Sequence, residues 1–346
     1  MSRRVAFVFP GQGSQAVGMG KDIYESSPAA RAVFELANRA LGFPLSQLCF
    51  GGPEATLRET INTQPALVAT SLAFLAALQE AAGAPPSEGN EPALRRPLRP
   101  SFVAGHSVGE YSALVTAGAL SITEALLLVR ERGRLMHLEG TRVDSGMAAI
   151  LGLDRTALEP LCEEASDQAR TALGAEAELH PGAGRVVVAN DNAPGQLVIS
   201  GARDALERAM ELAKAAGAKR VVPLTVSGAF HSPVMAPASE GLARSVANAP
   251  IADAEIPIIA NITARPVQSS VEVREELARQ IASPVQWTRT VEYLAAEGVD
   301  TFVEIGSGQV LSGLVKRIAK GVTILSVGAA TEVAPVAEQL ATPLSE

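Results

Sequence analysis

Short apolar segments of the kind that form β-strands alternate with helical segments along nearly the whole chain. Residues 5–9 and 101–105 are clear strand candidates, while 28–42 and 65–83 carry the signals of helices. Strands that alternate with helices favour a parallel sheet, because the crossover between two parallel strands is usually a helix. The pattern therefore predicts an α/β fold with helices packed around a parallel sheet.

From about residue 141 the pattern changes to short β-branched runs. Four such runs occur in order: "GMAAILGL", "RVVVAND", "GQLVISG" and "KRVVPLTV". Helical stretches follow the first and the third, which gives the β-α-β-β-α-β order of a ferredoxin-like α+β unit. We therefore expect a ferredoxin-like subdomain over residues 141–219, inserted into a large α/β domain formed by residues 1–140 and 220–328.

Three further segments depart from this alternation. Residues 83–100 are rich in proline, glycine and charge, which predicts a surface loop. Residues 167–184 form a polar stretch after the helix expected over 154–166, and we interpret them as an insertion within the small subdomain. Residues 329–346 have weak periodicity, so we expect a loosely held C-terminal tail.

The composition is that of a soluble globular protein, with 47% hydrophobic and 19% charged residues among 346. The net charge of −8 gives no indication of nucleic-acid binding. Cys49 and Cys162 are too few for a disulfide framework or a metal site. The first apolar run is too short for a signal peptide, and no window approaches a membrane span. We expect a cytoplasmic protein.

Residues 105–109 have the G-x-S-x-G pattern, between the strand expected over 101–105 and a helix. In this context the pattern predicts a nucleophile elbow, whose glycines permit a tight turn that exposes the serine hydroxyl. The positive end of the following helix faces that hydroxyl, and the Val108 amide is free to donate. We predict that Ser107 is a nucleophile; a structural turn is the alternative.

An activated serine requires a base, and the chain has only four histidines. His231, in "TVSGAFHSPVM", follows an expected strand end, where open α/β sheets place their sites. His106 adjoins the nucleophile and is expected to line the pocket, whereas His137 and His180 are surface candidates. We predict that His231 is the base; a loop histidine that caps the neighbouring helix is the alternative.

Arg132 lies in the middle of the apolar face of the helix expected from Ser121. A buried guanidinium without a partner is costly, so Arg132 needs an anionic partner in the protein or in a ligand. A substrate carboxylate held by a bidentate fork is favoured, because this pair of helices begins at the expected nucleophile. A structural salt bridge is the alternative.

The loop after the first strand, "GQGSQAVGMGK", matches neither the dinucleotide-binding pattern nor the P-loop. An oxyanion hole requires two amides, of which the elbow supplies one at Val108. Gln12 lies in a glycine-flanked turn and can present its N–H. We therefore predict that this loop binds the oxyanion of a tetrahedral intermediate.

Six motifs, spread in order over residues 5 to about 328, together resemble the malonyl-CoA:acyl carrier protein transacylase family. They are "FPGQGSQ", "GHSVGEYSA", the "RG" that begins 25 residues after Ser107, "GAFHSP", "SPVQWTRTVEYL" and "EIGSGQVLSGLVKRI". The resemblance implies a hydrolase-like parallel-sheet core with an inserted ferredoxin-like subdomain. It also implies six roles: nucleophile Ser107, base His231, oxyanion amides Gln12 and Val108, carboxylate-binding Arg132, and Gln280, whose main-chain carbonyl orients the histidine in place of a triad acid.

The implied reaction is a ping-pong transfer of malonyl from malonyl-CoA to the phosphopantetheine thiol of acyl carrier protein, for fatty acid synthesis. It needs no bound cofactor, and a monomer is expected. Phe230, in the "GAFH" motif, tends to accompany malonyl in related polyketide acyltransferases and is expected to line the pocket with His106. The resemblance also implies an acidic acyl carrier protein, so docking needs a cationic patch. Two sets are candidates: Lys316, Arg317 and Lys320, or Arg95, Arg96 and Arg99. For each set the alternative is an ordinary solvated face.

Three alternative functions share parts of this pattern. A polyketide synthase acyltransferase that acts in trans would have the same acyl-pocket residues. A serine thioesterase or esterase would share Ser107 and His231 but should need an acid, for which Asp191 is the candidate. A non-catalytic docking subunit would have no need of the nucleophile, the base and the buried arginine together.

Overall fold

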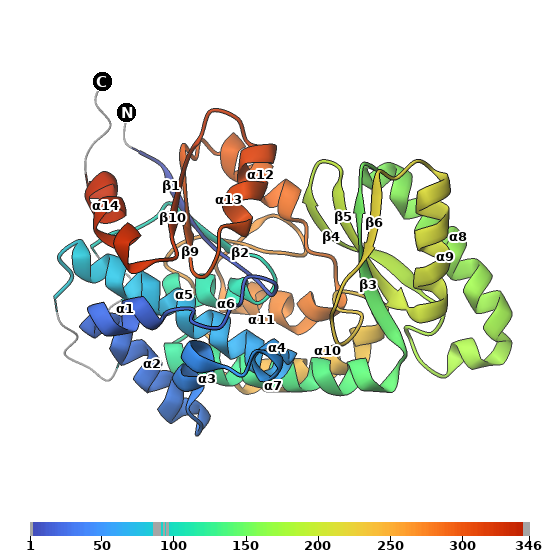
Figure 1. Cartoon of the computed structure of the whole chain (residues 1–346), viewed down its shortest axis with the longest axis horizontal. Coiled ribbons are helices and arrows are strands. Elements are labelled where there is room, and N and C mark those ends of the chain that lie inside the picture. The colour runs from blue at the N-terminus through green and yellow to red at the C-terminus, as the bar shows by residue number, and fades with distance from the viewer. Residues whose placement is uncertain (1–2, 86–90, 93, 95–96, 342–346) are drawn as a thin grey trace.

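A six-stranded, mostly parallel sheet forms the centre of the larger lobe (Figure 1). The computed structural model describes residues 3–85, 91–92, 94 and 97–341. In sheet order the strands are β10 (Thr323–Val327), β9 (Thr301–Ile305), β1 (Val5–Phe9), β2 (Phe102–Gly105), β7 (Ile258–Ile259) and β8 (Pro266–Val267). Only the β7–β8 pairing is antiparallel within this sheet.

Helices cover both faces of the sheet because successive side chains of a strand point to opposite faces. In β1, Phe7 and Phe9 join one apolar core, while Ala6 and Val8 join the other. The first core packs α1 (Lys21–Ser26), α2 (Pro28–Leu41), α3 (Leu45–Gly51), α4 (Glu54–Arg58), α5 (Thr60–Ala81), α6 (Gly109–Thr116), α7 (Ile122–Arg142), α10 (Ala236–Asn248), α11 (Ser270–Arg279) and α14 (Ala330–Ala341). The second packs α12 (Trp287–Ala296) and α13 (Val310–Ile318).

The helix expected from residue 65 begins earlier, at Thr60, so that Pro65 lies inside it. Proline cannot donate to the carbonyl four residues before it. The Arg130 guanidinium donates to that carbonyl, on Ile61, over 2.8 Å instead. This explains how the helix continues through the proline.

The same helix, α5, is long and apolar enough to cross a membrane, so the expectation that no window approaches a membrane span is wrong on length and composition. However, 94% of its apolar window is buried inside the protein. A helix that contacts protein on every side is apolar on every side. Its composition therefore reflects its central position in the core.

The smaller lobe is an antiparallel sheet with two helices packed on it. Its strands, in sheet order, are β4 (Val186–Ala193), β5 (Gln196–Ala202), β3 (Ser145–Leu151) and β6 (Arg220–Pro223). The helices α8 (Arg155–Leu173) and α9 (Arg203–Ala215) follow the first and the third strand of the chain order. The predicted fold class, an α/β core with a ferredoxin-like α+β unit, is confirmed. The expected boundary at residue 219 is wrong, because β6 pairs with β3 and so belongs to the smaller lobe.

Two expectations about irregular segments are wrong. The helix expected to end at residue 166 continues to Leu173, because Ala169 still faces the apolar core of the small lobe. The C-terminal segment is helical from Ala330 to Ala341 and buries Val333 and Val336 against the large core, so it is not loosely held there.

The loop expected over residues 83–100 lies partly outside the described residues, as do Arg95 and Arg96 of one candidate patch. Its described part is tied to the core by Gln79, whose amide donates to the carbonyls of Leu94 and Leu98.

Candidate active site

Ser107 occupies a tight turn between β2 and α6 and has a positive φ of 53°. Glycine is required on both sides of it. A Cβ on Gly105 would lie 2.0 Å from the carbonyl carbon of Gly109, and one on Gly109 would lie 2.2 Å from the oxygen of Phe9. The Asn261 side chain holds the turn, accepting from the Ser107 amide and donating to the Gly105 carbonyl, each over 2.7 Å. The strand–turn–helix context expected for G-x-S-x-G is therefore present.

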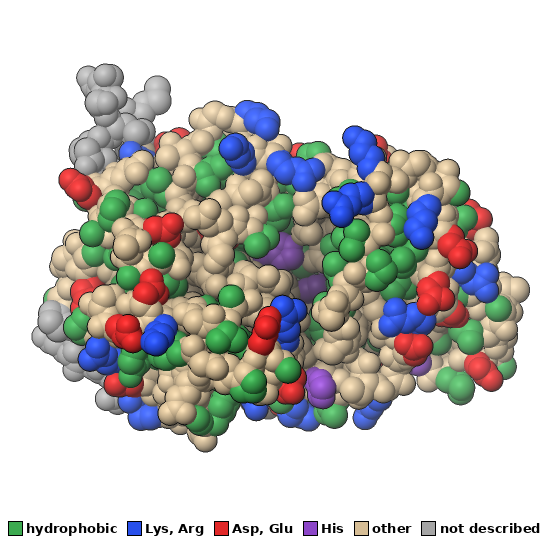
Figure 2. All heavy atoms as spheres, viewed as in Figure 1, with side chains coloured by type: hydrophobic (Ala, Val, Ile, Leu, Met, Phe, Trp, Pro, Cys, Tyr) green, Lys and Arg blue, Asp and Glu red, His purple; other side chains and the backbone are tan. Residues whose placement is uncertain are grey.

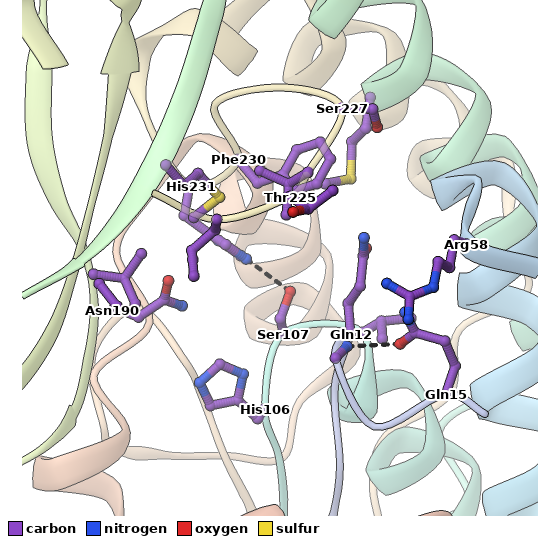
Figure 3. Close-up of a pocket in the computed structure, with 18 of the residues that line it drawn as sticks. Gln12, Gln15, Arg58, His106, Ser107, Asn190, Thr225, Ser227, Phe230 and His231 are labelled. Atoms are coloured by element: carbon purple, nitrogen blue, oxygen red, sulfur yellow. Dashed lines mark hydrogen bonds between the residues drawn. The ribbon is translucent and has the colours of Figure 1, made fainter. Parts of the chain in front are cut away.

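His231 follows β6 and directly precedes Ser232, which caps a short 3₁₀ helix. Its Nε2 lies 2.7 Å from the Ser107 Oγ (Figure 3). Its Nδ1 lies 3.0 Å from the carbonyl oxygen of Gln280 and 3.1 Å from that of Ser283. Carbonyls only accept, so Nδ1 carries the proton and Nε2 is free to accept from the serine hydroxyl.

The electrostatic surroundings keep this histidine neutral. Burial, assisted by the nearby charge of Arg132, lowers the pKa of His231 to about 3. A neutral imidazole at physiological pH is the form that can remove a proton. The pair Ser107 and His231 thus has the geometry and the protonation state of a nucleophile with its base.

Arg132 of α7 is buried beside this pair, at 1% exposure. Its Nη2 donates to the Ser107 Oγ over 3.0 Å and to the Gln280 Oε1 over 2.8 Å, and its Nη1 donates to the Gln64 Oε1 over 2.6 Å. Its buried Nε has no hydrogen-bond partner. Among the described residues no carboxylate forms an ion pair with it, so the structural salt bridge considered from the sequence is absent there. Its charge is free for an anionic ligand.

Gln12, after β1, and Val108, at the start of α6, line the same cleft as Ser107, and each carries a main-chain N–H. Neither donates to any residue in the described part of the chain. Gly11 allows the first loop to approach the elbow, since a Cβ there would lie 2.4 Å from the His106 carbonyl oxygen. The Gln12 side chain is held by Thr60, whose hydroxyl donates to it over 3.1 Å. The arrangement suits the binding of an oxyanion.

A cleft of about 770 Å³ opens between the two lobes at this point. The space-filling view shows it as a hollow with histidine at its floor (Figure 2). Gln12, Ser107, His231 and Phe230 line it from the large lobe, and residues of the antiparallel sheet such as Asn190 line it from the other side (Figure 3). The cleft can hold an extended substrate whose reactive end reaches the serine.

His106 lines the same cleft without contacting His231. Its Nε2 lies 2.8 Å from the Asn192 Oδ1, and its ring lies beside Trp287, with centroids 5.7 Å apart. His180 lies elsewhere, where its Nε2 is 2.9 Å from a carboxylate oxygen of the buried Glu139.

Asp191, the acid that a hydrolase would need, does not contact His231. Its carboxylate accepts from the Thr288 hydroxyl over 2.6 Å. The Nδ1 of His231 is already directed at two carbonyl oxygens. The geometry therefore gives no support to a serine–histidine–aspartate triad.

Several polar residues around the site were not found from the sequence: Gln64, Glu110, Asn261, Ser283 and the side chain of Gln280. A polar residue inside an otherwise apolar helix, as at Gln64, is one usable signal. An asparagine directly after an apolar strand, as at Asn261, is another. The remaining contacts join residues far apart in the chain, which no local pattern reveals.

An α/β core with an antiparallel insert carries a serine hydrogen-bonded to a histidine, beside a buried arginine with no ionic partner in the described part of the chain. This combination fits the class of acyl transferases. The family model for the acyl transferase domain matches residues 6–336. The chain is an acyltransferase.

Comparison with similar proteins shows which family of acyltransferases the chain belongs to. A malonyl CoA-acyl carrier protein transacylase of Bacillus subtilis is 42% identical over 94% of this chain and 93% of the relative. The solved transacylase of the same name from Coxiella burnetii is 35% identical, with a TM-score of 0.86 over 99% of both chains. A malonyl-transacylase solved in complex with a type II PKS acyl-carrier protein is 37% identical, with a TM-score of 0.85 over 97% of this chain and 99% of that one. The chain belongs to the malonyl CoA-acyl carrier protein transacylase family.

Proposed function

We propose that this protein transfers the malonyl group from malonyl-CoA to the phosphopantetheine thiol of acyl carrier protein, through a malonyl ester on Ser107. The product supplies fatty acid synthesis. The observation that carries this proposal is the hydrogen-bonded pair of Ser107 and His231 beside Arg132, a buried cation to which no described residue provides an ionic partner.

In the first half-reaction, the neutral Nε2 of His231 takes the hydroxyl proton as the Ser107 Oγ attacks the thioester carbonyl. The amides of Gln12 and Val108 donate to the oxyanion that forms, and the positive end of α6 supports the same charge. When the intermediate collapses, the C–S bond breaks and the CoA sulfur leaves with the proton from His231. Malonyl remains on Ser107 as an ester.

In the second half-reaction, the phosphopantetheine thiol gives its proton to His231 and attacks the ester carbonyl. The same two amides hold the second oxyanion. The C–O bond breaks, the Ser107 oxygen recovers a proton from His231, and the malonyl thioester leaves. The carbonyls of Gln280 and Ser283 keep the imidazole oriented through both halves.

Arg132 accounts for the choice of acyl group. Its guanidinium binds the free carboxylate of malonyl, and an acetyl group would leave this buried charge without a partner. Sites built to pair a polar group reject analogues that lack it far more strongly than a missing methylene is rejected. We therefore propose malonyl-CoA as the substrate, with no resident cofactor.

The partner and the setting belong to the same proposal: a monomer in the cytoplasm that docks acyl carrier protein at the cleft mouth. One of the two cationic sets considered for docking consists of Lys316, Arg317 and Lys320. Arg317 of this set already donates to the Gln196 side chain and to the Pro194 carbonyl. A second candidate pathway, polyketide synthesis, is favoured by the solved relative that binds a type II PKS acyl-carrier protein. Transfer rates to carrier proteins of both pathways, measured side by side, decide between them.

The proposal is tested by intact mass after mixing the enzyme with malonyl-CoA, in parallel with acetyl-CoA and with a Ser107→Ala variant. We expect a malonyl adduct on the wild type alone, no adduct on the variant, and little or none from acetyl-CoA. Release of CoA with no trapped adduct and no carrier protein would instead identify a hydrolase. Neither adduct nor release would exclude malonyl-CoA as the substrate.

A further inference from the structure

The side chain of Gln280 contacts three groups of the site, in addition to the main-chain contact with His231. Its Oε1 accepts from the Arg132 Nη2 over 2.8 Å. Its Nε2 donates to the Ser107 carbonyl over 3.1 Å and to a carboxylate oxygen of Glu110. Gln280 is 1% exposed, so water does not replace any of these bonds.

The orientation of this amide follows from its neighbours. The Ser107 carbonyl and a carboxyl oxygen of Glu110 face the Nε2 end, and a guanidinium faces the Oε1 end. The reversed amide would point its oxygen at the Ser107 carbonyl, which can only accept, and its N–H groups at a cation. Only one orientation is therefore stable.

This amide separates Arg132 from a carboxyl group that lies in the same buried region. Glu110 is 1% exposed, and its other carboxyl oxygen accepts from the backbone N–H of Asn261 over 3.2 Å. Burial raises the pKa of the Glu110 carboxyl well above its usual value, but direct contact with the Arg132 guanidinium, without Gln280 between them, would favour the ionised form. Such a pair would neutralise the cation that the acyl carboxylate needs.

Arg132 donates to side chains of two other helical segments, those of Gln64 and Gln280. Both of these acceptors are neutral amides. They orient the guanidinium without neutralising it. We infer that the Gln280 side chain is a positioning residue that holds Arg132 by a neutral acceptor, apart from Glu110, and thereby sets the preference for a carboxylated acyl group. This inference rests on the proposed function.

Substitutions at Gln280 separate this role from the main-chain role, because every variant keeps the carbonyl that faces His231. Gln280→Met keeps the volume and removes the side-chain hydrogen bonds. Gln280→Glu keeps the shape and places a carboxylate against Arg132, where it competes with the carboxylate of the substrate. The readout is the ratio of kcat/KM for acylation of the enzyme by malonyl-CoA to that by acetyl-CoA.

We expect this ratio to fall about 10- to 100-fold in Gln280→Met, the effect of one lost hydrogen bond to a charged group, and further in Gln280→Glu. The matched control is Gln79→Met, which removes the hydrogen bonds of another fully buried glutamine, outside the cleft. It should lower the melting temperature and leave the ratio unchanged. The two Gln280 variants are compared at temperatures at which their thermal unfolding curves show them folded.

A merely structural role for the side chain would slow both substrates alike. If the folded Gln280→Glu variant, or the folded Gln280→Met variant, keeps the wild-type ratio, the inference is overturned while the proposed function stands. If the wild type itself forms no malonyl ester on Ser107, the proposed function fails first. The wild-type adduct therefore distinguishes the two failures.

Discussion

Ser107 and His231 both have backbone torsions that residues with a side chain rarely adopt, with φ values of 53° and 57°. A single residue in this region costs about 1 kcal/mol or more, so the surroundings must hold it. Asn261 accepts from the Ser107 amide, and the Ile281 carbonyl accepts from the His231 amide over 2.9 Å. Each turn projects its side chain toward the other, which brings the two reacting atoms to 2.7 Å.

The first prediction at this scale concerns pH. Because burial lowers the pKa of His231 to about 3, this proposed base stays neutral as the pH falls from 7 to 5. The rate of Ser107 acylation by malonyl-CoA, measured by rapid-mixing CoA release, should therefore change little over this range. If the histidine had the ordinary pKa of about 6.5, its neutral fraction would fall roughly 25-fold over this range, and the acylation rate would fall with it. An acid limb centred near pH 6.5, with the fold intact by circular dichroism, would contradict the prediction.

The unit that presents Ser107, the proposed nucleophile, is β2–turn–α6, which is packed tightly against β1. A Cβ on Gly109 would lie 2.2 Å from the Phe9 oxygen, so α6 can approach β1 only with glycine at that position. The same close approach places the Val108 amide next to the N-terminal loop. The two glycines of the motif thus serve the packing of a helix on a strand as well as the turn itself.

Gly109→Ala should therefore displace the start of α6 and the Val108 amide with it. We expect acylation to slow on the order of 10²-fold, the usual effect of a shift of about 1 Å in a catalytic group. The free energy of unfolding should fall by about 1–3 kcal/mol through overpacking. Both are measured on purified protein, by CoA release and by urea unfolding.

The control for this prediction is Gly313→Ala in α13, where an added Cβ meets nothing within 4 Å. That variant should gain up to about 1 kcal/mol of stability from better helix propensity and keep the wild-type rate. Equal effects of the two substitutions would show that the loss at Gly109 is not due to the contact with Phe9.

At the scale of the whole molecule, the site lies where the two lobes meet. The lobes are joined by hydrogen bonds between β4 and the segment before α12, from the Asp191 amide to the Val285 carbonyl and from the Val285 amide to the Ala189 carbonyl. Two buried carboxyl groups lie near the site: burial raises the pKa of both Glu110 and Glu276, and the charge of Glu276 raises the pKa of Glu110 further. Burying them couples global stability to pH.

Burial raises the pKa of Glu276 to about 7, against 4.5 in the unfolded chain. The folded state therefore keeps a proton that the unfolded state has released, and this stabilisation is lost as the pH rises from about 4.5 to about 7. Over this window the unfolding free energy of the wild type should fall relative to Glu276→Gln, on the order of 3 kcal/mol. Urea unfolding of both proteins at several pH values measures it, and parallel pH profiles would contradict it.

The sequence by itself determined the fold class, the strand–turn–helix around Ser107 and the selection of His231 and Arg132 as candidates. Apolar periodicity, glycine spacing and the small number of histidines can be read from the sequence directly. They can be interpreted without knowing how the chain packs. The family resemblance extended this to Gln12, Val108 and the Gln280 carbonyl, whose roles stay proposals.

Only the tertiary structure decided which groups surround these residues. Residues far apart in the chain meet at the elbow: the Gln280 side chain, Glu110 and Asn261. Gln280 and Ser107, which share one hydrogen bond, are 173 residues apart in the sequence. The early start of α5 and the docking of α14 likewise depend on contacts with Arg130 and the large core. Such contacts arise from packing between distant segments, and local propensity carries no information about which distant side chain completes a hydrogen bond.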